Sequence, residues 1–227
     1  MIRHFALLVS LAVFLAGCGQ TQAVREEGAV NAILKLGGKV TRDEKLPGRP
    51  TVEVDLGETQ VADSDLKNLK ELKGLQTLWL CYTHTQITDA GLKDLKELKG
   101  LQWLFLSSTQ ITDAGLKDLK ELKGLQELDL GNTQITDAGL KDLKELKGLE
   151  ILWLYGTQIT DAGLKDLKEL KGLKSLDLAG TQITDAGLKD LKELKGLEML
   201  HLYGTQITDT GLKELKQALP KTKILGH

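Results

Sequence analysis

The amino-acid sequence predicts an α/β solenoid in which short strands of a parallel sheet alternate with short helices. The first observation is a verbatim repeat: the sixteen residues TQITDAGLKDLKELKG occur five times, beginning at residues 85, 109, 133, 157 and 181. The second is a constant period, because units begin at residues 51, 75, 101, 125, 149, 173 and 197, which are 24 residues apart with one interval of 26. Internal repeats of this length are typical of solenoids, whose units stack along one axis.

Residues 1–17 have the pattern of a signal peptide. A basic segment with Arg3 precedes an apolar run over residues 5–16, which is too short to be a permanent membrane anchor. The run ends in LAGC, residues 15–18, which resembles the bacterial lipobox. The resemblance implies cleavage before Cys18, lipidation of Cys18 and, because Gly19 follows it, sorting to the outer membrane. We therefore expect a lipid-anchored protein of the bacterial cell envelope, on the periplasmic side or the surface; the alternative is an ordinary secretory signal with a chance cysteine.

The segments that follow the signal peptide divide by composition. Residues 18–27 are polar and are expected to form a tether. Residues 28–50 are expected to form an N-terminal cap, in which AVNAILKLGG is a short helix ended by glycines and a hairpin turns at Pro-Gly. The seven units occupy residues 51–219. Residues 220–227 form the C-terminal cap, because Pro220 ends the last helix and KTKIL can cover the sheet edge.

Each unit reads as strand, turn, helix and turn. In the unit that begins at residue 101, LQWLFL alternates, so Leu104 and Leu106 share one face of a strand. Thr112 then begins a helix, on which leucines 116, 119 and 122 have helical spacing, and Gly124 permits the turn that ends it. One unit has too few apolar side chains to offset the entropy that its backbone loses on ordering, so the units must stack and pool their leucines in one core.

The pattern LxxLxLxxTxITDxGLxxLxxL, which covers residues 51–219, resembles the bacterial form of the leucine-rich repeat. The resemblance implies an arc or horseshoe, with a parallel sheet on the concave face and helices on the convex face. It also implies that one threonine per unit bonds the backbone of the loop, as asparagine does elsewhere in the family. A polar recognition row is the alternative for these threonines, which are Thr59, Thr85, Thr109, Thr133, Thr157, Thr181 and Thr205.

Sequence variation among the units is confined mostly to the third, fifth and seventh strand residues, which point away from the leucine core. These positions hold every tryptophan of the protein. Recent tandem duplication explains the verbatim copies, but it does not explain why the differences concentrate on one face. Clustered aromatic surface residues mark interaction sites. The expected binding face comprises Trp79, Trp103, Phe105, Glu127, Asp129, Ile151, Trp153, Tyr155, Asp177, Met199, His201 and Tyr203.

The leading interpretation is a binding module whose concave face takes a protein or peptide. The alternative ligand is a carbohydrate such as a cell-wall glycan, with the aromatic residues as stacking platforms and the carboxylates as hydroxyl acceptors. A structural spacer without a ligand is the third interpretation. Nucleic acid is disfavoured, because the net charge is −2 and the lysines alternate with acidic residues instead of forming a basic stripe. Membrane contact is expected through the N-terminal lipid alone.

Several groups of residues could be interpreted as catalytic or metal-binding sites. The simpler interpretation of each is a set of polar residues on a solvated face. Glu127 and Asp129 share a strand face, and Ser175, Asp177 and His201 are expected to be neighbours, but an open sheet offers neither a pocket nor an oxyanion site. No enzyme, cofactor or metal site is therefore expected. Histidines 84, 201 and 227 lie far apart in the array, and once Cys18 is acylated Cys81 is a lone thiol that cannot form an intramolecular disulfide.

Overall fold

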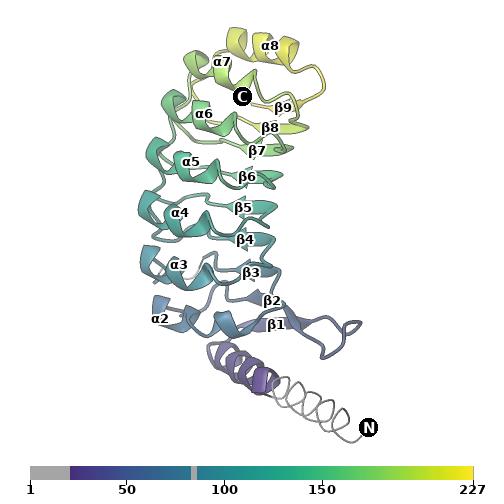
Figure 1. The fold of residues 1–227 in the computed structure, drawn as a ribbon. Helices are drawn as coiled ribbons and strands as arrows, with labels where there is room; N and C mark the ends of the chain where they lie inside the picture. The colour runs from purple at the N-terminus through teal and green to yellow at the C-terminus, as the bar shows by residue number, and fades with distance from the viewer. Residues whose placement is uncertain (1–20, 83–85, 227) are drawn as a thin grey trace, which may run out of the picture.

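The computed structural model describes residues 21–82 and 86–226. These residues form a gently curved solenoid in which the strands line the concave side and the helices the convex side (Figure 1). The expected signal peptide 1–17, Cys18 and the first residues of the tether lie outside the described part, as do Thr83, His84, Thr85 and His227.

The chain enters the solenoid through a helix, and this corrects the expected tether. Residues 21–35 are helical, so the described part of the tether, residues 21–27, belongs to the cap. The Gln22 side chain donates to the carbonyl oxygen of Glu71 at 2.7 Å, and Glu26 accepts from the backbone N–H of Thr51 at 2.7 Å. These long-range bonds hold residues 21–27 in a helix. The segment has no apolar periodicity, so its sequence does not predict that helix.

A nine-stranded sheet runs the length of the molecule in sequence order. Strand β1 (Lys39–Arg42) pairs antiparallel with β2 (Thr51–Asp55), which confirms the hairpin, and each later neighbour pairs in parallel. The later strands are β3 (Thr77–Trp79), β4 (Trp103–Phe105), β5 (Glu127–Asp129), β6 (Ile151–Trp153), β7 (Ser175–Asp177), β8 (Met199–His201) and β9 (Lys223–Leu225). As expected, β9 covers the edge of the last unit.

The convex helices are shorter than the leucine spacing predicts. The α-helices are α2 (Asp63–Leu66), α3 (Asp89–Leu95), α4 (Asp113–Leu119), α5 (Asp137–Leu143), α6 (Asp161–Leu167), α7 (Leu188–Leu191) and α8 (Asp209–Ala218). Two 3-10 helices accompany them, η1 (Leu69–Glu71) and η2 (Asp185–Gly187). Helix α4 therefore ends before Leu122, which is still fully buried. Gly124 does not adopt the left-handed conformation expected of a helix-ending glycine; a Cβ there would lie 3.4 Å from the Leu101 and Lys99 carbonyl oxygens of the preceding unit.

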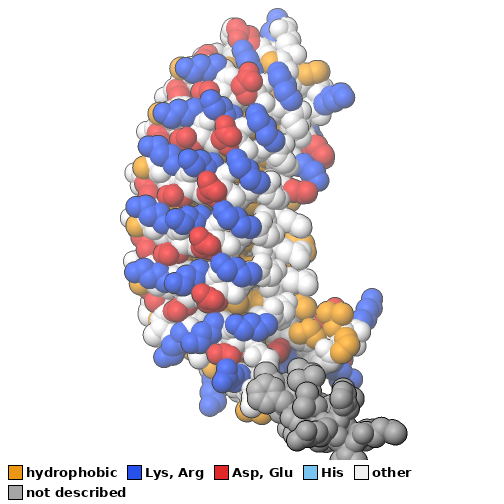
Figure 2. Space-filling model, viewed as in Figure 1, with side chains coloured by type: hydrophobic (Ala, Val, Ile, Leu, Met, Phe, Trp, Pro, Cys, Tyr) orange, Lys and Arg blue, Asp and Glu red, His pale blue; other side chains and the backbone are white. Residues whose placement is uncertain are grey.

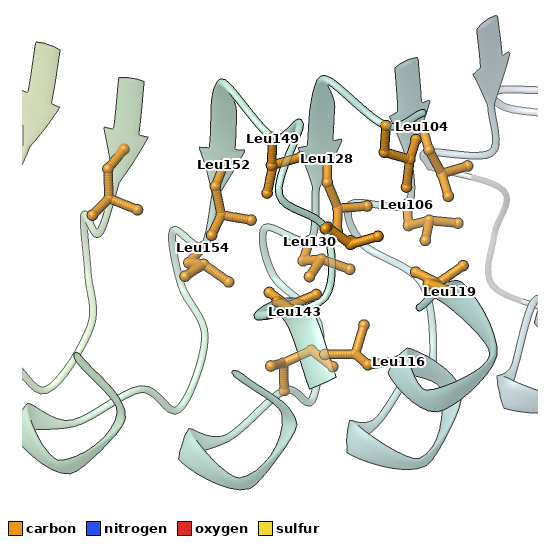
Figure 3. Packing of buried hydrophobic residues seen from close by; sticks show 14 of the residues in the cluster. Leu104, Leu106, Leu116, Leu119, Leu128, Leu130, Leu143, Leu149, Leu152 and Leu154 are labelled. Atoms are coloured by element: carbon orange, nitrogen blue, oxygen red, sulfur yellow. The ribbon is translucent and has the colours of Figure 1, made fainter. Parts of the chain in front are cut away.

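The leucine core extends from the first unit to β9. Figure 3 shows part of it, between the strands and the helices. The unit that begins at residue 125 is representative, because its seven leucine and isoleucine side chains are all 0 % exposed. They are Leu125, Leu128, Leu130, Ile135, Leu140, Leu143 and Leu146. The core thus supplies the stacking energy that a single unit lacks.

Contacts between neighbouring units involve three positions of the copied block, which are its second threonine, its first aspartate and its first glycine. Thr112 caps α4, because its hydroxyl accepts from the Ala114 N–H at 3.3 Å. The same hydroxyl donates to Asp89 of the preceding unit at 2.6 Å, and the Thr112 backbone N–H donates to the other carboxylate oxygen at 2.9 Å. A Cβ on Gly115 would collide with that Asp89 carboxylate. Equivalent pairs are Asp63–Thr88, Asp113–Thr136, Asp137–Thr160, Asp161–Thr184 and Asp185–Thr208.

The threonine row bonds the loop backbone, as the family resemblance implies. The Thr109 hydroxyl donates to the carbonyl oxygen of Leu106 at 2.6 Å, and Thr59, Thr133, Thr157, Thr181 and Thr205 donate in the same way to the leucine three residues earlier. Their hydroxyls are thus engaged in loop bonds within the scaffold. Thr85 lies outside the described residues.

The convex surface carries columns of opposite charge that follow from the copied helices. Figure 2 shows basic and acidic side chains alternating over the helical side of the molecule. Some pair across units: Lys99 Nζ lies 3.6 Å from a Glu121 carboxylate oxygen, and Lys123 Nζ lies 3.4 Å from one of Glu145. Exposed pairs of this kind contribute little stability individually.

Candidate binding face on the concave side of the sheet

The parallel register sets the variable residues in three rows across the strands. Trp103 pairs with Thr77 on one side and Glu127 on the other, and Phe105 pairs with Trp79 and Asp129 in the same way. In β3 to β6 and in β8, a buried leucine separates two half-buried residues on the opposite face. The rows that the sequence predicts therefore exist and share the concave face.

Side chains on this face are more covered than a fully solvated surface requires. Of the twelve residues expected to bind, Tyr203 is the most open at 48 % exposed, whereas Asp177 is 8 % exposed and the others are half-buried. Adjacent strands lie only about 4.8 Å apart, so large side chains in one row pack against their neighbours. The tryptophans consequently contribute to the scaffold as well as to the surface.

The first aromatic cluster contains Trp79 and Phe105. Their ring centroids are 3.7 Å apart and the ring planes are inclined by 4°, so the rings stack face to face across β3 and β4. Each ring covers one face of the other. One face of each ring remains uncovered by the other ring. Trp103 lies in the adjacent row, and Tyr82 stands exposed just beyond the strand.

Two tryptophans donate hydrogen bonds to glutamates on the strand immediately before their own in the sheet. The Trp79 indole N–H donates to Glu53 at 3.0 Å, and the Trp153 indole N–H donates to Glu127 at 2.9 Å. In both cases the glutamate lies on the adjacent preceding strand, because β2 pairs with β3 and β5 with β6. Glu127 is therefore part of a second aromatic cluster, around Trp153. Each bond joins adjacent units and orients the indole ring.

His201 extends the second cluster towards the C-terminal units. Its ring lies 6.3 Å from that of Trp153, at 85°, and its Nδ1 atom lies 3.3 Å from an Asp177 carboxylate oxygen. The Nε2 atom of His201 is buried and, within the described residues, has no hydrogen-bond partner. Ser175 is thus not bonded to that nitrogen, and the histidine does not form the relay that a serine nucleophile requires.

A polar cluster occupies the centre of the face. Burial raises the pKa of Asp129, although the Gly131 N–H at 2.9 Å and the Ser107 hydroxyl both stabilise its charged form. Burial also raises the pKa of Tyr155 to about 12. A Cβ on Gly131 would fall inside the Tyr155 ring, so this tyrosine lies directly over the glycine. The space above Gly131 is therefore filled by the Tyr155 side chain.

Sequence reasoning missed the first unit of the face. Glu53, Asp55 and Gly57 continue the three rows onto β2, because Glu53 pairs with Thr77 and Asp55 with Trp79. The signal was present: EVDLG at residues 53–57 matches ELDLG at residues 127–131, and each segment precedes a strand with tryptophan in the fifth position. The degenerate remainder of that unit obscured the match.

Among the described residues, no cluster of three or more histidine, cysteine or acidic side chains is arranged to hold a metal ion. No helix in that part of the chain has the length and apolar character needed to cross a bilayer. Cys81 is a free, half-buried thiol.

The repeats are recognised by known leucine-rich repeat patterns. The family described as Leucine Rich repeats (2 copies) matches residues 99–145 and 123–169, and the one described as Leucine Rich repeat matches residues 173–192. No curated protein matches the chain.

Three of the solved structures with a similar fold come from two bacteria. A leucine-rich repeat protein of Leptospira interrogans is 29 % identical with a TM-score of 0.54, and the match covers 69 % of this chain and 38 % of that one. Internalin C2 of Listeria monocytogenes is 23 % identical with a TM-score of 0.56, over 87 % of this chain and 91 % of that one. The functional domain of InlJ from the same bacterium, which includes a cysteine ladder, is 20 % identical with a TM-score of 0.52, over 70 % and 31 %. The chain thus carries leucine-rich repeats and folds as an α/β leucine-rich repeat solenoid.

Proposed function

We propose that the protein is a non-enzymatic binding module whose concave face takes another protein. The observation that carries the proposal is the division of labour within each unit. The constant threonine and aspartate residues bond across neighbouring units and the constant leucines form the core, whereas the variable residues share one face and include every tryptophan. Aromatic residues on an accessible, half-buried surface are the side chains most enriched among binding hot spots.

An enzymatic role receives no support from the face. The carboxylates of Glu127 and Asp129 are engaged with Trp153 and with the Gly131 N–H respectively. The histidine of the candidate relay has no nucleophile on its Nε2 atom within the described residues. A binding role requires neither an oxyanion site nor a means of excluding water.

The same proposal includes a lipid anchor. The LAGC segment at residues 15–18 supports acylation of Cys18 and a position in the bacterial envelope, at the outer membrane. Mass spectrometry of the native N-terminus tests the anchor: a diacylglyceryl group on Cys18 supports it, and an unmodified N-terminus refutes it.

Comparative capture tests the binding role. Immobilised residues 19–227 are exposed to envelope extract, beside a Trp103→Ala, Trp153→Ala double variant and a convex-face control, Glu97→Gln. We expect specific proteins to be retained by the wild type and the control and to be lost from the double variant, which circular dichroism must show to be folded. Equal retention on all three contradicts the proposal. Co-sedimentation with purified cell-wall glycan that depends on the same tryptophans would assign the face to glycan instead.

A further inference from the structure

A hollow of about 380 Å³ opens on the concave face beside Trp79. Residues of β2, the turn after it and the end of β3 line it: Glu53, Asp55, Gly57, Glu58, Trp79, Cys81 and Tyr82. Phe105 stacks on Trp79 from the β4 side and is not part of the lining. The hollow therefore presents the remaining face of the Trp79 indole.

The equivalent position further along the sheet explains why this hollow is open. Strands β2 and β5 share the pattern Glu-x-Asp-Leu-Gly, and in both places a tryptophan on the next strand donates its indole N–H to the glutamate. The Tyr155 ring lies over Gly131 at the second place. Cys81 occupies the corresponding position beside Gly57, and its short side chain leaves the space unfilled.

The charges around the hollow are predominantly negative. Three carboxylates, those of Glu53, Asp55 and Glu58, line it. An exposed cation lies beside them: Lys39 Nζ is 3.2 Å from an Asp55 carboxylate oxygen. Burial, followed by the charge of Asp129, raises the pKa of the Cys81 thiol, so this group adds no negative charge at neutral pH. Carboxylates thus outnumber the cation beside an open indole face.

We infer that this hollow binds an arginine side chain of the partner protein. An arginine guanidinium is planar and stacks on the face of an aromatic ring, of which tryptophan is the most favourable, while its N–H groups donate to carboxylates. Trp79 supplies the ring and Glu58 an acceptor. One Asp55 oxygen accepts from the Gly57 N–H at 2.9 Å, and the other, which Lys39 contacts, is the second acceptor. The assignment rests on the proposed protein-binding role and names the chemistry that one end of the concave face recognises.

Nuclear magnetic resonance of the three indole N–H groups tests the assignment, because the protein has only three tryptophans. The signals are assigned with single Trp→Phe variants, and N-acetyl-arginine methylamide is titrated at low salt. We expect the Trp79 signal to shift saturably and the Trp153 signal, from the filled equivalent site, to stay in place. Uncharged N-acetyl-glutamine methylamide is expected to leave Trp79 unchanged. Equal shifts of both indole signals, or no shift of Trp79, would overturn the inference.

Two variants sharpen the test in opposite directions. Cys81→Tyr should fill the hollow as Tyr155 fills its counterpart and weaken binding of the arginine probe by about tenfold. Lys39→Ala removes the competing ammonium and should tighten binding by about twofold. Unchanged Trp103 and Trp153 signals verify that each variant is folded. Wild-type affinity in folded Cys81→Tyr contradicts the arginine site, and so does stronger binding of N-acetyl-lysine methylamide than of the arginine probe.

Failure of this inference is distinguishable from failure of the proposed function. If protein capture depends on Trp103 and Trp153 but survives Cys81→Tyr, the concave face binds a protein and the arginine site is wrong. If capture does not depend on the face at all, the binding role fails, whereas the titration still reports directly on the hollow.

Discussion

At the scale of single residues, one position per unit adopts the left-handed backbone conformation. It is the eighth residue of every unit. Gly156, Gly180 and Gly204 occupy it in the last three units with φ of 65°, 68° and 68°. The first four units carry other residues there, which are Glu58, Tyr82, Ser108 and Asn132, with φ from 52° to 59°. Residues with a Cβ are strained in this conformation. The N-terminal half of the solenoid therefore carries backbone strain that glycine at the same position would relieve.

Replacing one such residue should therefore stabilise the fold. Ser108→Gly relieves the strain but increases the freedom of the unfolded chain, so we expect the free energy of unfolding to rise by about 0.5–1 kcal/mol. Gly180→Ala is the reverse control: a Cβ there meets no atom closer than 3.6 Å, so it introduces strain without a clash. Urea denaturation should show the two variants shifted in opposite directions. Shifts of the same sign would contradict the conformational explanation.

At the scale of one element, the convex helices are set by their neighbours more than by their own propensity. Helix α5 has only seven residues, too few for stability alone, and is capped by Thr136, which bonds Asp113 of the preceding unit. Gly139 is unfavourable inside a helix, yet it is required because the Asp113 carboxylate lies where its Cβ would be.

Glycine-to-alanine substitution in two helices separates these effects. A Cβ added at Gly28, in the N-terminal helix, would meet no atom within 4 Å, so Gly28→Ala should raise the free energy of unfolding by about 0.5–1 kcal/mol. Gly139→Ala should instead lower it by about 1–3 kcal/mol, because the methyl group displaces the Asp113 carboxylate and the Leu116 side chain. Thermal unfolding measures both. A stabilised Gly139→Ala would show that the ladder between units tolerates the extra methyl group.

The elements also show where sequence reasoning works. The repeat pattern predicts three features: the leucine period, the Thr-Asp starts of the helices and the alternation along the strands. Each of these features depends on contacts that recur in every unit. The helical state of residues 21–27 depends on bonds such as Gln22 to Glu71, which have no local signature. The hollow beside Trp79 depends on the size of one residue on the next strand, Cys81 or Tyr155, and only the register between strands reveals it.

At the scale of the whole molecule, the copied residues and the variable residues have different roles. The copied threonine, aspartate and glycine positions contact one another across units, as Thr112 and Gly115 contact Asp89, so a change at one of these positions must be matched in the neighbouring unit. The concave residues face neighbours of different kinds, as Trp79 faces Phe105 and Asp55, so they can change independently. A rigid scaffold therefore presents a variable surface.

The dissociation constant of the captured partner tests this claim most directly. Isothermal titration should compare the wild type with Trp103→Ala on the concave face and Glu97→Gln on the convex face. The account predicts a loss of about 2 kcal/mol, roughly 30-fold in dissociation constant, for Trp103→Ala, as for truncated hot spots, and no change beyond about twofold for Glu97→Gln. Identical dissociation constants for the two variants would contradict it and place the binding surface elsewhere on the molecule.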